Sequence, residues 1–107
     1  MPSEGNLRTF LIGDVRGYTR FTAEHGDAAA AALATTFAAL ARDATEARSG
    51  RVIELRGDEV LAVFASSAQA VRAALELQTT CAEEMATDPS LPLLVGIGRA
   101  SCRERVS

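Results

Sequence analysis

The stretch that most limits how this chain can fold is Arg51 to Phe64, which reads RVIELRGDEVLAVF. Two apolar, β-branched runs flank a turn from Arg56 to Glu59, and a glycine inside such a turn is typical of a β-hairpin. The turn also carries two adjacent carboxylates, Asp58 and Glu59, which a hairpin does not need. An acidic hairpin tip is either a solvated surface turn or a place to hold a divalent cation. The choice depends on whether the rest of the chain supplies a partner for Asp58.

Size and composition indicate one modest globular domain. The chain has 107 residues, 48% of them hydrophobic, and a net charge of −3, which argues against a nucleic-acid backbone as the partner. No segment reaches the roughly 18 apolar residues of a membrane helix, and the N-terminus lacks a signal-peptide pattern. The two cysteines, Cys81 and Cys102, have neither metal-site nor disulfide-framework spacing, which favours a reducing, cytoplasmic setting.

Apolar periodicity and turn signals predict the element order β-α-α-β-β-α-β. Helices between strands force crossovers, so we expect an α+β fold, a ferredoxin-like α/β sandwich with one sheet and helices on one face. The expected strands are Leu7 to Asp14, Arg51 to Leu55, Val60 to Phe64 and Leu91 to Ile97. The expected helices are Tyr18 to His25, Ala28 to Arg48, and a third from Ser66 or Ser67 to about Ala86.

Caps and periodicity also predict helix ends and buried faces. Asp27 is expected to cap the second helix, and Ser49-Gly50 to end it through a glycine C-cap. The core-facing stripe of this helix is Leu33, Phe37, Leu40 and Ala44. The third helix is expected to face the sheet through Ala70, Val71, Ala74, Leu75 and Gln78.

The C-terminal stretch Arg99 to Ser107, RASCRERVS, differs from the rest of the chain. It is arginine-rich, lacks periodicity and is expected to continue no element. A back-translation of residues 97–106 resembles a sequencing-adapter oligonucleotide. We therefore predict that residues 7–98 are a partial domain, that 99–107 is a non-native tail from adapter read-through, and that the natural gene continues differently after Gly98.

A second acidic residue gives Asp58 a partner. Asp14 closes the first strand, and in the expected sheet the end of that strand lies beside the start of the third. Two carboxylates there would be hard oxygen ligands that leave open positions for phosphate and water. The residues that follow, Val15-Arg16-Gly17-Tyr18-Thr19, lead into a helix N-terminus, whose backbone N–H groups and dipole suit a triphosphate. Gly17 would let the backbone approach closely.

These motifs and their spacing resemble a class III nucleotidyl cyclase catalytic domain, most closely the bacterial adenylate/guanylate cyclase homology domains. The resemblance rests on FLIGDVRGYTRF, a long helix, SGRVIELRGDEVLAVF, a further helix and LPLLVGIG. It runs from about Leu7 to Gly98. It implies a palm-like cyclase fold that this chain carries only in part, because the family's domain extends further at the C-terminus.

The resemblance also implies roles for individual residues. Asp14 and Asp58 match the two metal-binding aspartates, Val15 matches a residue whose carbonyl contacts the metal, and Arg16 to Thr19 match the phosphate-contacting turn. Two Mg²⁺ or Mn²⁺ ions would activate the ribose 3′-hydroxyl of ATP or GTP and neutralise the leaving pyrophosphate. The family's site forms between two domains, so a homodimer or paired cyclase domain is implied, fused to other signalling domains in the full protein.

One position departs from the adenylyl cyclase pattern. Where those enzymes carry a lysine that helps to select adenine, this chain has Glu54, and it contains no lysine. Guanylyl cyclases carry a glutamate there, an acceptor suited to guanine; Glu54 is equally consistent with an ordinary strand residue. The family's second base contact and its transition-state asparagine and arginine would lie beyond Gly98. No catalytic residue is therefore expected here besides the metal ligands, and the fragment is expected to be inactive.

Three functional interpretations compete. The first is a purine nucleotidyl cyclase domain, truncated here. The second is a degenerate cyclase-homology domain that binds nucleotide or a partner domain and regulates an attached module. The third is a diguanylate cyclase of the related palm fold, whose GGDEF hairpin tip resembles Arg56 to Glu59, although the turn after Asp14 fits the first pattern better. The single histidine, His25, is expected to cap a helix C-terminus rather than bind a ligand.

Overall fold

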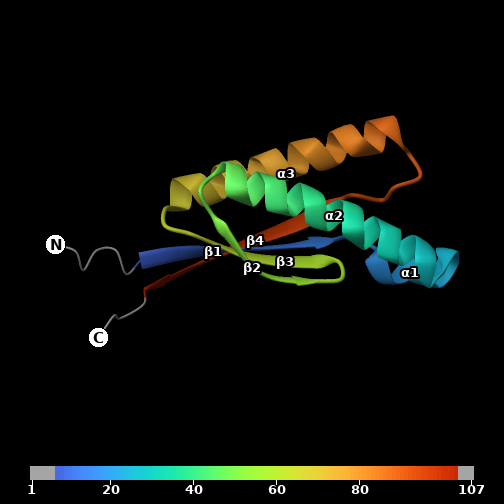
Figure 1. The fold of residues 1–107 in the computed structure, drawn as a ribbon, viewed down its shortest axis with the longest axis horizontal. Coiled ribbons are helices and arrows are strands. Elements are labelled where there is room, and N and C mark those ends of the chain that lie inside the picture. Colours follow the sequence, from blue (N-terminus) through green and yellow to red (C-terminus); the bar gives the residue numbers. More distant parts are fainter. Residues whose placement is uncertain (1–6, 104–107) are drawn as a thin grey trace.

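Four antiparallel strands form one sheet in the order β2-β3-β1-β4, and α2 and α3 lie on the same side of it (Figure 1). The computed structural model describes residues 7–103. It confirms the predicted α+β sandwich and the predicted element order. The elements are β1 (Leu7–Val15), α1 (Tyr18–His25), α2 (Asp27–Ala47), β2 (Arg51–Arg56), β3 (Glu59–Phe64), α3 (Ser67–Thr87) and β4 (Val95–Arg103).

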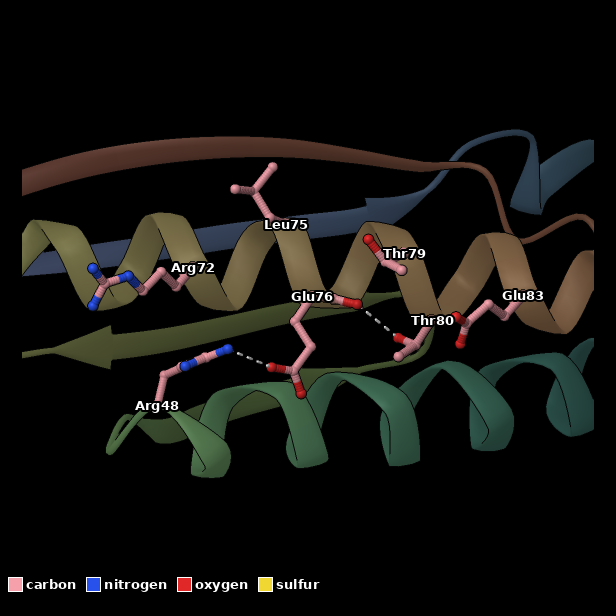
Figure 2. A pocket seen from close by; sticks show the side chains of 7 residues that line it. All are labelled: Arg48, Arg72, Leu75, Glu76, Thr79, Thr80 and Glu83. Carbon is pink, nitrogen blue, oxygen red and sulfur yellow. Dashed lines mark hydrogen bonds and ion pairs between the residues drawn. The ribbon is translucent and has the colours of Figure 1, made fainter.

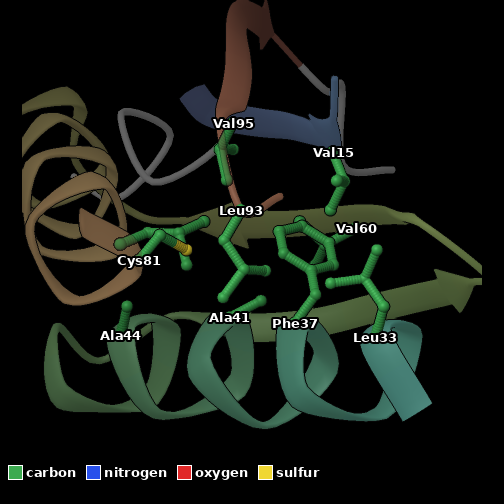
Figure 3. Packing of buried hydrophobic residues seen from close by; sticks show 10 residues of the cluster. Val15, Leu33, Phe37, Ala41, Ala44, Val60, Cys81, Leu93 and Val95 are labelled. Carbon is green, nitrogen blue, oxygen red and sulfur yellow. The ribbon is translucent and has the colours of Figure 1, made fainter. Parts of the chain in front are cut away.

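The core lies between the sheet and the two long helices, as Figure 3 shows for its larger cluster. Leu33, Phe37 and Ala44 of α2 are buried as predicted. Leu40 only packs against the edge of the cluster, and Ala41 takes the central place. Successive helix residues point about 100° apart, so a small rotation of α2 about its axis turns Ala41 instead of Leu40 toward the core. Alanine at this position lets α2 approach the sheet closely.

The predicted buried face of α3 is only partly right: Ala70 is buried and Ala74 packs against the smaller core cluster, but Val71, Leu75 and Gln78 are exposed. The helix buries Ala70, Ala73, Leu77 and Cys81. Val71 and Leu75, the large residues of the predicted face, are 40% and 58% exposed. The buried positions follow a 3–4–4 spacing of mostly small side chains. Periodicity weighted by side-chain size therefore selects the wrong face of a helix that packs closely through alanines.

Two helix ends differ from the prediction in their chemistry. The N-cap of α2 is Gly26, and Asp27 lies inside the first turn without a side-chain capping hydrogen bond. After α2 the left-handed residue is Ser49 (φ 62°), while Gly50 donates from its N–H to the Thr45 carbonyl oxygen. Gly50 is needed for another reason, because a Cβ there would overlap the ring of Phe64. Ser66 does cap α3, accepting from the Gln69 N–H at 3.1 Å.

The fourth strand begins later and ends later than predicted, at Val95–Arg103 instead of residues 91–97. Pro92 has no N–H to give to a ladder, so the segment before Val95 stays irregular although Leu93 is buried. Residues 99–103 pair with β1, which corrects the expectation that this stretch continues no element. Pairing uses main-chain groups that any residue supplies. That the stretch is non-native stays a prediction, and residues 104–107 lie outside the described residues.

Candidate active site

The hairpin tip is attached to the end of β1. The β2–β3 connection is the two-residue turn Gly57-Asp58, with Gly57 in the left-handed region at φ 58°. Positive φ at the first turn residue alone fits a type II′ turn, in which glycine is preferred. The Val15 N–H donates to the Asp58 carbonyl oxygen at 3.0 Å, and Asp14 is the register partner of Glu59. The two predicted metal-ligand aspartates thus come from adjoining main-chain segments.

Strand register shows which of the predicted site residues lie on the sheet face opposite the helices. One row across the sheet runs Arg56, Glu59, Asp14, Gly96, and the next runs Glu54, Leu61, Ile12, Gly98. Side chains of directly paired residues point to the same face. Ile12 is 42% exposed, whereas Leu11 and Val15, which point the other way, are buried in the core. Asp14 and Glu54 therefore share the uncovered face of the sheet.

The acidic residues offer a sparse set of oxygen ligands. Within the described part of the chain, no three His, Cys, Asp or Glu side chains gather as a self-sufficient metal cage. The side chain of Asp14 is 50% exposed, and its Oδ1 lies 3.9 Å from Arg16 Nε. Two carboxylates and nearby carbonyls fit Mg²⁺ or Mn²⁺, since such ions keep several waters and take further oxygens from substrate phosphates. The donor chemistry therefore fits the predicted metals.

The turn after β1 presents the N-terminus of α1. Gly17 is the N-cap at φ 76°, and no side chain donates to or accepts from this helix end as a cap. The N–H groups of the first turn of α1 have no capping side chain, whereas the Arg16 N–H just before them donates to the Leu94 carbonyl oxygen. Phosphate binding by residues 16–19 stays a prediction. Thr19 is exposed. The Tyr18 side chain turns away, because its hydroxyl donates to the Ala30 carbonyl oxygen at 3.2 Å. The Tyr18 side chain is therefore not the part of this residue that the phosphate prediction can rest on.

Two shallow hollows meet at Arg16. One, of about 240 Å³, lies on the uncovered sheet face, and the other, of about 290 Å³, lies beside α1. Arg16 lines both. Sequence reasoning missed the floor of the first, which Gly96 and Gly98 leave without side chains; a G-x-G spacing in an edge strand was the available signal. His25 lines the second and stacks on Phe21 with ring centroids 4.5 Å apart.

Glu54 is not a free acceptor in this structure. Its Oε2 forms an ion pair with Arg56 Nη2, and the Glu54 carboxylate raises the pKa of Arg56 by hydrogen bonding and by its charge. Both side chains are substantially exposed. A register shift between Val52 and Glu54 marks a β-bulge, which turns Glu54 opposite Leu61 and onto the uncovered face. The i, i+2 spacing of Glu54 and Arg56 places both side chains on one face of the strand, but the sequence did not reveal the bulge that determines which face this is.

A larger hollow, of about 500 Å³, lies away from these residues, along α3 and beside Arg48 at the end of α2. Figure 2 shows Arg48 and Glu76 reaching toward each other across it, with Arg48 Nη2 3.3 Å from Glu76 Oε1. The other residues that line it are Arg72, Leu75, Thr79, Thr80 and Glu83. It contains none of the predicted site residues, so this hollow and the predicted metal and phosphate ligands lie on different faces of the domain.

The fold is that of nucleotidyl cyclase domains of known structure, as comparison with known proteins shows. Neither a family model nor a curated protein sequence matches the chain. Solved structures do match. A bacterial light-regulated adenylyl cyclase has a TM-score of 0.81 at 19% identity, covering 90% of this chain and 53% of its own. The guanylyl cyclase Cya2 has a TM-score of 0.75 at 25% identity, covering 90% and 54%.

A third match is the dimeric guanylyl cyclase domain of the RhoGC fusion protein from the aquatic fungus Blastocladiella emersonii. Its TM-score is 0.72 at 15% identity, covering 90% of this chain and 57% of its own. The resemblance found in the sequence is therefore confirmed as a shared fold, that of the class III cyclase domain. The chain spans about half the length of the structures that it matches.

Proposed function

We propose that this chain is part of a purine nucleotidyl cyclase domain, which converts ATP or GTP into a 3′,5′-cyclic nucleotide and pyrophosphate. One observation carries the proposal: the Val15–Asp58 main-chain hydrogen bond joins the segments that hold Asp14 and Asp58. These two acids lie 44 positions apart in the sequence, and the antiparallel pairing of β1 with β3 sets the end of β1 beside the hairpin turn. The helix N-terminus of α1 follows directly.

Different residues are proposed to bind the metal ions and the phosphates. Asp14, Asp58 and the Val15 carbonyl would hold Mg²⁺ or Mn²⁺ as two ions, which supply Lewis-acid activation of the ribose 3′-hydroxyl and neutralise the phosphates. The N–H groups at the start of α1 bind the triphosphate, and Arg16 adds a cation. The 3′-oxygen then bonds to the α-phosphorus as the bond to pyrophosphate breaks, and the hydroxyl proton passes to water.

Substrate and assembly follow from the same site. Glu54 shares the uncovered face with Asp14, and a carboxylate acceptor there favours GTP over ATP. That face is open on this chain, so a second cyclase domain is proposed to close the site, as a homodimer or a paired domain. A fusion protein with other signalling domains, in the cytoplasm, is the setting we propose. Within residues 7–103, no helix is long and apolar enough to cross a membrane.

A regulatory domain is the second candidate, and the Glu54–Arg56 ion pair favours it. A carboxylate that is already paired gives up part of its ability to read a base, since the Arg56 charge must first be displaced. A domain with this pair would bind nucleotide or a partner domain without turnover. Formation of cyclic nucleotide by the longer protein distinguishes the cyclase from the regulatory domain.

The deciding experiment uses the domain encoded by the parent gene, assayed with Mn²⁺ and either ATP or GTP. Cyclic nucleotide formation that disappears in Asp58→Ala and persists in Asp43→Ala, an exposed acid on α2, supports the cyclase. Nucleotide binding without product supports the regulatory domain. Turnover that survives Asp58→Ala contradicts the metal assignment. The 107-residue chain itself is expected to form no cyclic nucleotide.

A further inference from the structure

Arg16 occupies a defined position beside Asp14. Its main-chain N–H donates to the Leu94 carbonyl oxygen at 2.7 Å, which joins the turn after β1 to the segment before β4. Its side chain is 68% exposed, and its Nε lies 3.9 Å from Asp14 Oδ1. The guanidinium therefore stands next to the carboxylate that we assign to the metal.

A glycine makes this position possible. Gly96 is the register partner of Asp14, and a Cβ built on Gly96 would overlap Nε, Cζ and Nη2 of Arg16. Gly98, two residues further along the same strand and on the same face, would meet nothing within 4 Å. The guanidinium thus lies in the space that any other residue at position 96 would fill. The two glycines form a matched pair, of which only one contacts Arg16.

We propose that Arg16 is the built-in counter-ion of the metal site, lying on Gly96 beside Asp14 until a divalent cation and a triphosphate replace it. The inference rests on the proposed function, because it takes Asp14 as a metal ligand. A divalent ion at Asp14 and the guanidinium repel each other at this range, so the ion binds well only when Arg16 moves. Arg16 also lines the hollow beside the N-terminus of α1, where a triphosphate would attract it.

This arrangement links the two ligands of the site. A triphosphate that draws Arg16 away from Asp14 strengthens metal binding, and by reciprocity the metal strengthens triphosphate binding by the same factor. The Arg16–Asp14 ion pair is exposed and its atoms are 3.9 Å apart, so we expect a small change in Mn²⁺ affinity. Exposed ion pairs of this kind correspond to about 1.5- to 5-fold in an equilibrium constant.

The test measures Mn²⁺ binding to the 107-residue chain, using the electron paramagnetic resonance signal of free Mn²⁺ and no nucleotide. Arg16→Gln is expected to bind Mn²⁺ about 2- to 5-fold more tightly than the parent chain, and Arg16→Lys, which keeps the charge, to bind it like the parent. Gly96→Ala removes the space for the guanidinium and should raise affinity as Arg16→Gln does. Gly98→Ala should leave affinity unchanged. In an Arg16→Gln background, Gly96→Ala should cause no further change in Mn²⁺ affinity.

Inorganic triphosphate gives the second measurement. It should raise Mn²⁺ affinity of the parent chain more than that of Arg16→Gln, after correction for Mn²⁺ bound by free triphosphate. Equal or weaker Mn²⁺ binding by Arg16→Gln, or a Gly96→Ala effect that persists without Arg16, overturns the inference. Asp14→Asn separates this from the proposed function: if Mn²⁺ binding survives that substitution, or if neither parent nor Arg16→Gln binds Mn²⁺, the metal assignment itself fails. Circular dichroism confirms that each variant is folded.

Discussion

The Val15 N–H donates to the Asp58 carbonyl oxygen, so the hairpin tip is held to the end of β1 by main-chain atoms alone. The Asp58 carboxylate is not part of that attachment. We therefore expect Asp58→Asn to keep the free energy of unfolding within about 0.5 kcal/mol of the parent and to abolish detectable Mn²⁺ binding. Chemical denaturation and Mn²⁺ titration on the same sample measure both.

Asp43→Asn is the control, because it removes an equally simple carboxylate from an exposed position on α2. It should change neither quantity. Loss of stability in Asp58→Asn would mean that the carboxylate supports the turn, and unchanged Mn²⁺ binding would mean that it is a solvated hairpin acid.

Gly50, which follows α2, packs directly against the ring of Phe64 in β3. A methyl group at position 50 overlaps the Phe64 ring, which is buried and cannot move freely. Gly50→Ala is expected to cost about 1–3 kcal/mol of stability, the range for overpacking. Phe64→Leu should relieve part of this cost, so the double variant should be more stable than the sum of the single effects predicts. Simple additivity of the two would contradict the contact.

At Ser49, the residue before Gly50, we expect a substitution to raise stability instead of lowering it. It adopts φ 62°, where glycine is the favoured residue, although the sequence places the glycine next to it. Ser49→Gly is expected to stabilise the domain by up to about 1 kcal/mol. A thermal melt of this variant beside Gly50→Ala should show shifts in opposite directions. A lower melting temperature for Ser49→Gly would show that its side chain does more than tolerate the turn.

The fold followed from the sequence wherever a pattern was local. Hairpin, helix order and the Ser66 cap rest on turn chemistry and periodicity within a few residues, and the structure has them. The face of α3 and the start of β4 depend on what packs opposite. Alanines that allow close approach outweigh the larger Val71 and Leu75, and Pro92 delays the strand despite its apolar neighbours.

In the candidate site, too, local sequence patterns were predictable and geometry across strands was not. That Asp14 and Asp58 lie on adjoining segments could be predicted, because a strand end and a hairpin tip are each recognisable and the topology joins them. The position of Gly96 and the sheet face of Glu54 and Arg56 could not be predicted, because both depend on geometry across strands. Register places Gly96 opposite Asp14, and a bulge after Val52 determines the direction of Glu54.

Cys81 provides a pH-dependent test of the core. Burial raises the pKa of the Cys81 thiol to about 11 from an ordinary value of 9.0, and the nearby Glu84 charge adds to the rise. The unfolded chain loses this proton at lower pH than the folded one, so the stabilisation is complete below pH 9 and falls as pH rises toward 11. At pH 10 the loss is about 1 kcal/mol. Urea denaturation between pH 8 and 10.5 measures it.

The comparison is best made in a Cys102→Ser background, so that one thiol remains. Cys81→Ala in that background should be less stable at pH 8, because a buried atom is lost, but should decline less between pH 9 and 10.5. The two stability curves should therefore converge as pH rises. In the same background, the folded protein should react with a thiol reagent at pH 8 only as fast as it opens. Parallel pH curves, or immediate labelling of the folded protein, would place Cys81 in contact with solvent rather than in the core.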